Sequence, residues 1–205
     1  MLLPRHCAVC REVGSSLCER CAALLSPAPE PEHLLGLDRC VALFAYEGAG
    51  RTVIGRLKYA NHRDSLGPLA KMLAAAVDSR ADLVTWVPTS PSRRRERGYD
   101  QAELIARAVA RSLSVRARPT VRRLDRGPQM GKQRSERLET RFSPLRPLRS
   151  GVVVVVDDVR TTGASLGGVA AALRSAGVEW VIGATLAATP SRGAESTRRS
   201  EPETD

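Results

Sequence analysis

The hydrophobic positions of this chain fall into short apolar runs separated by stretches of helical periodicity, an order typical of α/β proteins. The densest run is Val152–Val156, five consecutive valines. A β-branched run of this length is too short for an ordinary helix and predicts the central strand of a parallel sheet, buried on both faces. Similar patterns predict strands over 39–46, 83–87 and 178–187, with a weaker strand over 115–121. Apolar residues at helical spacing predict helices over 52–59, 66–77 and 102–113, and one more after Gly163. We therefore expect a mostly parallel sheet flanked by helices.

Polar and proline-rich segments divide the chain into parts. The segment SPAPEPE has the composition of a stiff linker, and the residues from 189 onwards are polar and lack periodicity. We predict a zinc-binding knuckle over 1–25, a linker over 26–37, a sheet domain over 38–188 and a disordered tail over 189–205. No apolar run approaches the ~20 residues of a membrane span. Since the start also lacks the pattern of a secretion signal, we expect a cytoplasmic protein without membrane insertion.

The charge of the chain narrows the choice of partners. A net charge of +10 and a pI near 10.2 predict attraction to polyanions such as nucleic acid, pyrophosphate compounds or acidic lipid. Arginine supplies nearly all of the positive charge, because the only lysines are Lys58, Lys71 and Lys132. The aromatic residues are two Phe, three Tyr and two Trp. Since single-strand binders usually stack bases on aromatic rings, any nucleic acid would be held mainly through its phosphates.

Four cysteines form two closely spaced pairs near the start of the chain. The spacing is C-x2-C-x7-C-x2-C, made by Cys7, Cys10, Cys18 and Cys21. Two such pairs can supply four thiolates to one tetrahedral zinc ion, and in a cytosolic protein they favour metal over disulfides. Because four protein ligands leave no open position, this zinc would be structural. The alternative is a set of redox or incidental cysteines.

The valine run leads into residues that suit a sugar phosphate. Two adjacent carboxylates, Asp157 and Asp158, follow where the strand is expected to leave the sheet. The turn after them contains Thr161, Thr162, Gly163, Ala164 and Ser165. A helix start offers unpaired N–H groups to a phosphate, the hydroxyls add donors, and glycine lets the backbone come close. The carboxylates would repel a phosphate, so they are placed to accept hydrogen bonds from sugar hydroxyls or to sit near Mg2+.

Other interpretations of this stretch explain less of it. An ordinary strand-to-helix turn needs one capping Asp or Thr, which leaves the second acid and the rest of the turn unexplained. The chain has no Walker A lysine motif and no GxGxxG turn after a strand, so nucleoside triphosphate and dinucleotide sites are disfavoured.

A run of arginines follows the strand predicted over 83–87. It consists of Arg93, Arg94, Arg95 and Arg97. Guanidinium groups beyond the carboxyl end of a strand suit phosphate or pyrophosphate oxygens, or the phosphates of a nucleic acid. A solvated charge run is the alternative. A second basic stretch, 122–141, has few apolar residues; it includes Arg122, Arg123, Arg126, Lys132, Arg134, Arg137 and Arg141.

These motifs resemble those of known families. The stretch VVVVVDDVRTTGAS resembles the phosphoribosyl pyrophosphate (PRPP) motif of the type I phosphoribosyltransferases. The text VPTSPSRRRERGYDQA resembles a segment of the ComF family, and the paired cysteines, this segment and the PRPP motif occur in that family's order. The resemblance covers most of residues 7–187. Asp100 departs from the family's more usual asparagine, which puts an amide-specific role there in doubt.

The resemblance implies a type I phosphoribosyltransferase-like fold with a zinc knuckle and a PRPP site. It implies that Asp157 and Asp158 hold the ribose hydroxyls, that residues 161–165 cradle the 5′-phosphate, and that Mg2+ accompanies PRPP. It further implies a role in handling single-stranded DNA during DNA uptake, with other DNA-uptake proteins as partners. Two alternatives remain: an active phosphoribosyltransferase with a base-like acceptor, and a PRPP-sensing regulator. The stretch 122–141 is expected to be either a ligand-closing loop or a disordered basic loop.

Overall fold

Parallel strands form the central sheet of the computed structural model, which describes residues 5–31, 34, 36–59, 65–124, 142–148 and 151–190. All neighbouring strands of this sheet are parallel. The strand order is β1 (Arg39–Ala45), β7 (Trp180–Ala188), β6 (Val152–Arg160), β2 (Leu83–Trp86) and β3 (Arg116–Ala117). The valine run therefore lies in the middle strand, as its apolar pattern predicts.

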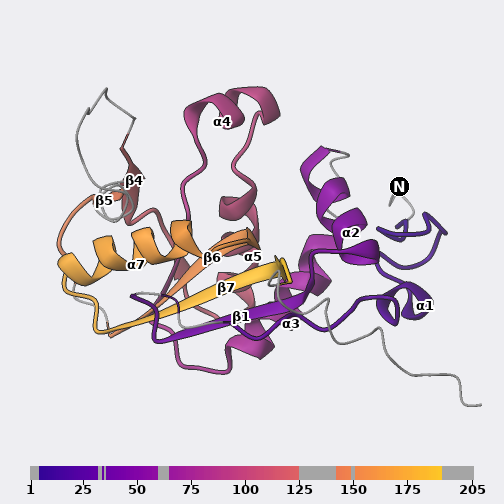
Figure 1. The fold of residues 1–205 in the computed structure, drawn as a ribbon, viewed down its shortest axis with the longest axis horizontal. Helices are drawn as coiled ribbons and strands as arrows, with labels where there is room; N and C mark the ends of the chain where they lie inside the picture. Colours follow the sequence, from indigo (N-terminus) through magenta and orange to yellow (C-terminus); the bar gives the residue numbers. More distant parts are fainter. Residues whose placement is uncertain are drawn as a thin grey trace, which may run out of the picture.

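Helices cover both faces of this sheet (Figure 1). Val153 and Val155 of β6 pack with apolar residues of one helix, whereas Val154 and Val156 pack with those of three others. Because successive side chains of a strand point to opposite faces, a strand between two helical layers needs apolar residues at every position. The helix on the first face is α7 (Ala164–Ser175), and those on the second are α2 (Gly48–Tyr59), α3 (Leu66–Val77) and α5 (Gln101–Ser112). The α/β architecture predicted from the sequence is confirmed.

In the described part of the chain, four short elements lie outside these layers. They are α1 (Glu19–Ala22), α4 (Pro91–Arg97), and the strands β4 (Val121–Arg123) and β5 (Phe142–Pro144), which pair antiparallel. The helix α4 is an addition to the elements predicted from the sequence. Ser90 caps its start by accepting a hydrogen bond from Arg93 N, and Gly98 ends it in the left-handed conformation. None of the helices in the described part of the chain has the length and apolar character that crossing a lipid bilayer requires.

Candidate functional site

The two acids lie inside β6, which corrects the expectation that the strand ends before them. The strand continues to Arg160 because β7 pairs with it that far, from Val152 opposite Trp180 to Arg160 opposite Ala188. On its other side, β6 pairs with β2 only as far as Val156. Residues 157–160 therefore form the end of β6 that extends past β2, at the carboxyl edge of the sheet, where open α/β sheets bind their ligands.

The regular register sends the two carboxylates to opposite faces of the sheet. Asp157 is opposite Thr185 of β7 and shares the face of Val155, which is covered by α7. Asp158 therefore points to the face covered by α2, where its Oδ2 lies 2.8 Å from Lys58 Nζ. A ligand that contacts both acids has to lie at the open edge of β6, because the strand itself separates the two faces.

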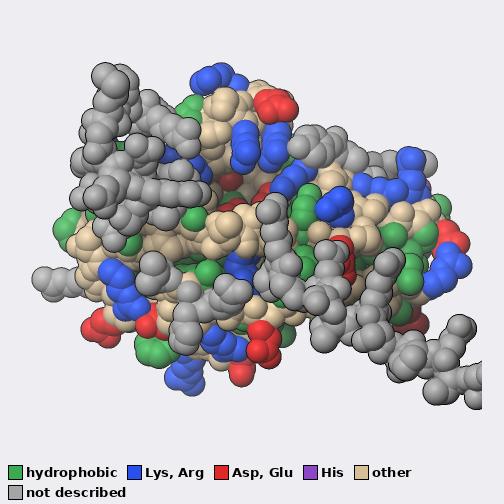
Figure 2. Space-filling model, viewed as in Figure 1, with side chains coloured by type: hydrophobic (Ala, Val, Ile, Leu, Met, Phe, Trp, Pro, Cys, Tyr) green, Lys and Arg blue, Asp and Glu red, His purple; other side chains and the backbone are tan. Residues whose placement is uncertain are grey.

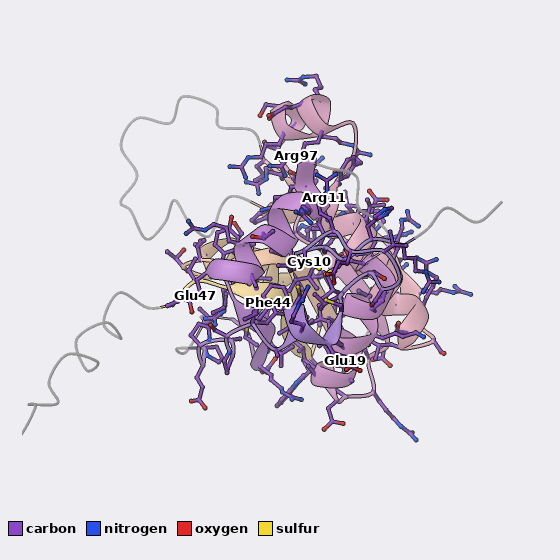
Figure 3. All side chains as sticks on the ribbon, turned by 90° about the vertical axis from the view of Figure 1, so that its right-hand side faces the viewer. Cys10, Arg11, Glu19, Phe44, Glu47 and Arg97 are labelled. Atoms are coloured by element: carbon purple, nitrogen blue, oxygen red, sulfur yellow. The ribbon has the colours of Figure 1, made fainter. Side chains whose placement is uncertain are left out.

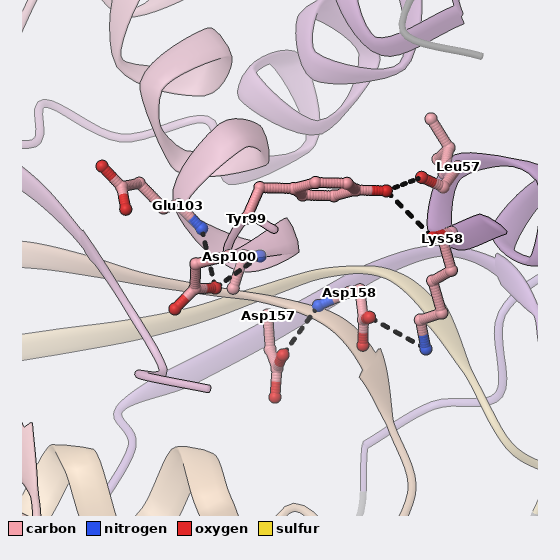
Figure 4. Close-up of polar contacts among 8 residues, drawn as sticks. Leu57, Lys58, Tyr99, Asp100, Glu103, Asp157 and Asp158 are labelled. Carbon is pink, nitrogen blue, oxygen red and sulfur yellow. Dashed lines mark hydrogen bonds and ion pairs between the residues drawn. The ribbon is translucent and has the colours of Figure 1, made fainter. Parts of the chain in front are cut away.

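The surroundings of Asp157 shift its pKa. Burial, and next the charge of Asp158, raise the pKa of Asp157 to about 8. Its Oδ1 accepts a hydrogen bond of 2.9 Å from Asp158 N (Figure 4). The neighbouring Thr185 is fully buried, and its hydroxyl has no hydrogen-bond partner among the described residues. At neutral pH, Asp157 is therefore mainly a neutral carboxyl, which can both donate and accept a hydrogen bond.

The turn after β6 has the geometry of an anion-binding helix start. Thr161 and Thr162 are exposed, Gly163 has φ +74°, and α7 begins at the next residue. Thr162 Oγ1 accepts a hydrogen bond of 3.4 Å from Ala164 N. Ser165 follows in the first turn of α7, where the backbone N–H groups lack partners within the helix. This turn therefore presents hydroxyls and N–H groups at the same edge as the acids.

The segment predicted as a linker, 26–37, packs beside this turn. A Cβ on Gly163 would lie only 2.4 Å from Leu34 Cδ2. Arg160 Nη2 donates a 2.9 Å hydrogen bond to Pro29 O, and Ala45 N donates one of the same length to Ser26 O. The described residues of the segment thus contact β1, β6 and the start of α7, and the sequence pattern contains no sign of these contacts.

The arginine run lies on α4, which projects from the body of the molecule (Figure 1). Arg93, Arg94 and Arg95 are exposed, and basic side chains gather over this helix in Figure 2. Arg97 is only partly exposed and lies at the base of the helix (Figure 3). The run and the acids are thus on different elements at the same edge of the sheet.

The residues that follow the arginine run contact the end of α2, which carries Lys58, the partner of Asp158. The Tyr99 hydroxyl lies 2.9 Å from the carbonyl oxygen of Lys58 and 3.1 Å from that of Leu57 (Figure 4). Asp100 caps α5 by accepting hydrogen bonds from Ala102 N and Glu103 N, and its second oxygen accepts one from Thr89 N. Both oxygens of Asp100 act as acceptors here, a role that a carboxylate fills and that the single oxygen of an asparagine amide does not.

Sequence reasoning missed Lys58, the partner of Asp158. One signal was available: Lys58 is one of three lysines in a chain whose positive charge is nearly all arginine. Of the second basic stretch, Arg122 and Arg123 lie in β4, and Arg123 Nε donates to Pro88 O. Arg126, Lys132, Arg134, Arg137 and Arg141 lie outside the described residues, as do residues 191–205 of the predicted tail.

The four N-terminal cysteines come together as their spacing predicts. Their Sγ atoms all lie within 4.8 Å of one another, and the distance from Cys10 Sγ to Cys18 Sγ is 3.8 Å. A tetrahedral zinc site with Zn–S bonds of about 2.3 Å has S–S edges of about 3.8 Å, so the cluster fits this ion. Burial acts to raise the pKa of Cys7, but hydrogen bonds from the Cys18, Val9 and Cys10 backbone lower it to about 6.

The cysteine cluster packs directly on the sheet domain. Arg56 of α2 donates a hydrogen bond of 3.2 Å to Cys7 O, and Ala8 is buried in the same apolar cluster as α2, α3 and α5. The same helix carries Lys58 in its last turn. The helix α2 therefore contacts the cysteine cluster at one position and Asp158 two residues later.

Comparisons with known proteins bear on the second half of the chain. A model of the phosphoribosyl transferase domain matches residues 100–200. No curated protein matches the chain. One similar solved structure is that of the allosteric regulatory enzyme of purine biosynthesis, with 21% identity and a TM-score of 0.43. The match covers 59% of this chain and only 25% of that one. Another is TT1426 from Thermus thermophilus, with 17% identity, a TM-score of 0.38, and coverage of 63% of this chain and 84% of that one.

The matched residues contain the candidate sugar-phosphate site. They begin at Asp100, the N-cap of α5, and include β6 with both acids, the turn at Gly163, α7 and β7. The cysteine cluster, α2 and the arginine helix precede them. From α5 to β7, this α/β protein is phosphoribosyltransferase-like, with a sequence that matches the phosphoribosyl transferase domain.

Proposed function

We propose that this chain is a ComF-type protein that binds PRPP at the carboxyl edge of β6. One observation carries the proposal. The two acids, Asp157 and Asp158, lie at the same edge of the sheet as the hydroxyl-bearing turn at Gly163, and all of these residues belong to the part of the chain that matches the phosphoribosyl transferase domain. Asp157 and Asp158 would hold the ribose hydroxyls. Thr161, Thr162, Gly163, Ala164 and Ser165 would hold the 5′-phosphate.

The electrostatics of the site suit a multiply charged anion. Because the pKa of Asp157 is about 8, the acidic pair carries mainly one negative charge at neutral pH, and Lys58 balances it at Asp158. An ordinary pair of ionised carboxylates would repel the phosphate groups of PRPP more strongly. The arginines of α4 would attract the pyrophosphate as it approaches the edge of the sheet. Mg2+ would come with the pyrophosphate of PRPP.

The same basic surface supports a role with single-stranded DNA. Arg93, Arg94 and Arg95 are exposed on a projecting helix, where flexible phosphate chains can reach them. A groove of about 370 Å³ between α5 and β3 is lined by two further exposed arginines, Arg111 and Arg107, of which Arg107 pairs with Glu103. We include DNA uptake in the proposal on this charge and on the motif resemblance, with other DNA-uptake proteins as partners and the cytoplasm as location.

Pyrophosphate release tests whether the bound PRPP is turned over. The wild-type protein is incubated with PRPP and Mg2+ for hours, alone and with each common nucleobase. Binding without release supports a binding or sensing protein, because the acids and the turn need only hold the sugar phosphate. Release that requires one particular base would assign an active phosphoribosyltransferase instead. Absence of PRPP binding would refute the proposed function.

A further inference from the structure

The ion pair between Lys58 and Asp158 is unusual for this protein. Its Nζ–Oδ2 distance is 2.8 Å, and each side chain is 17% exposed. In every other ion pair of the described residues, both side chains are more exposed. An exposed ion pair contributes little to stability because water screens the attraction between its charges. A largely buried charge has lost most of its water and is therefore costly without an oppositely charged partner. The Lys58 ammonium is therefore part of the environment in which Asp158 works.

The position of Lys58 is fixed from a second direction. The Tyr99 hydroxyl hydrogen-bonds at the carbonyl oxygens of Leu57 and Lys58, the last turn of α2. Its neighbour Asp100 is buried and caps the start of α5, so the backbone next to Tyr99 is held by the hydrogen bonds of this cap (Figure 4). This contact involves the backbone of Lys58, so a change of its side chain leaves the contact in place. Only the ammonium group is then removed from the site.

The two acids themselves offer little attraction for a free divalent cation, and the nearby Asp100, whose charge also raises the pKa of Asp157, already accepts hydrogen bonds through both of its oxygens. A magnesium site usually offers carboxylate oxygens with an excess of negative charge. Here one oxygen of Asp158 is already paired with an ammonium, and Asp157 is mainly protonated at neutral pH because its pKa is about 8. The carboxylates of the free protein therefore fit a resident Mg2+ poorly.

We propose that Lys58 is a positioning residue of the ribose site, which fixes Asp158 and supplies the positive charge that a magnesium ion would otherwise supply there. The inference rests on the proposed PRPP site. It implies that ribose 5-phosphate, which has no pyrophosphate to carry Mg2+, binds to this protein without the metal.

Calorimetric titration with ribose 5-phosphate tests the inference, once with excess Mg2+ and once in Mg2+-free buffer. That buffer is passed over a chelating resin before the protein is added, because a dissolved chelator could also remove zinc from the cysteine cluster next to α2. The wild type should bind equally well in both, within about twofold. Lys58→Met should weaken binding about tenfold or more in the Mg2+-free buffer, and Mg2+ should restore part of the loss, because the metal can then reach Asp158. Lys58→Arg should retain most of the affinity, since it keeps the charge. Lys71→Met, at an exposed position of α3, is the matched control and should change nothing.

Two results would overturn the role of Lys58. One is wild-type binding that disappears in the Mg2+-free buffer, an arm of the experiment that needs no variant to fold. The other is a folded Lys58→Met protein with wild-type affinity in both buffers, with folding checked by thermal melting and zinc content. Failure of the proposed function has a different signature, because neither ribose 5-phosphate nor PRPP would then bind to the wild type in any buffer.

Discussion

At the scale of the residue, Gly163 carries two separate constraints. Its φ of +74° is a conformation that L side chains rarely adopt, and a Cβ there would meet Leu34 Cδ2 at 2.4 Å. The first constraint belongs to the turn itself, and the second belongs to the segment packed over it. The two can be separated by experiment, because only the second depends on Leu34.

We predict that Gly163→Ala lowers the free energy of unfolding by about 1 kcal/mol or more and weakens ribose 5-phosphate binding. In the double variant Leu34→Ala/Gly163→Ala, part of this loss should be recovered relative to Leu34→Ala alone, because the clash is relieved and the strain of φ remains. Denaturant unfolding and calorimetry measure both effects. Gly55→Ala, inside α2 with open space around it, is the control and should be neutral or stabilising. Equal effects of the two single glycine changes would contradict the account.

The pKa of Asp157 makes a second prediction at this scale. Its value in the folded protein, about 8, lies above the value of about 4 expected in the unfolded chain. Between these values the folded state holds a proton that the unfolded state has lost, so stability falls as the pH rises through this window. Relative to Asp157→Asn, the wild type should lose up to about 1.4 kcal/mol of unfolding free energy per pH unit there. Urea unfolding across this window measures the difference, and a difference independent of pH would refute the assignment.

At the scale of the element, α2 joins two parts that the sequence predicts separately. Arg56 bonds to Cys7 O and Lys58 pairs with Asp158, so a single helix contacts both the cysteine cluster and the candidate ribose site. The projecting helix α4 differs from α2, because its first arginines are exposed to solvent and can contact a ligand that approaches from there.

We predict about one zinc ion per chain, held by Cys7, Cys10, Cys18 and Cys21. Cys18→Ser should loosen the cysteine-bearing segment and speed hydrogen exchange in α2, and leave the rest of the sheet domain folded. Elemental analysis of protein prepared without added metal measures the zinc, and hydrogen exchange measures the loosening. Cys40→Ser in β1 is the control and should keep full zinc content. A folded, metal-free wild type with four reactive thiols would exclude the zinc site.

The arginines of α4 give the prediction for nucleic acid. The logarithm of the affinity for single-stranded DNA should fall linearly with the logarithm of the salt concentration. Changing Arg93, Arg94 and Arg95 to alanine should flatten this slope by up to about 2–3 units, because each arginine would neutralise one phosphate. An unchanged slope would remove α4 from the DNA surface. If the wild type does not bind DNA even at low salt, the DNA part of the proposal fails.

At the scale of the whole molecule, local sequence pattern predicted the layers but not the contacts between distant segments. Val152–Val156 indicated the middle strand because burial on both faces requires an apolar residue at each position. The four cysteines indicated their own cluster because metal ligands recur at short spacing. The end of β6 was misplaced because pairing with β7, distant in sequence, extends the strand through both acids. Lys58 was missed for the same reason, since nothing near residue 58 reveals that its partner is Asp158.

The most direct test of the proposed PRPP site is a calorimetric titration of the wild type and of Asp157→Ala with PRPP. The wild type should bind, and the variant should lose roughly tenfold to a hundredfold in affinity, because removing one hydrogen-bonding group from a site built for hydroxyls costs ~1–3 kcal/mol. Ser112→Ala, at the end of α5, is a control that should keep wild-type affinity. Equal affinity of the wild type and Asp157→Ala, or no binding of PRPP by the wild type, would contradict the account.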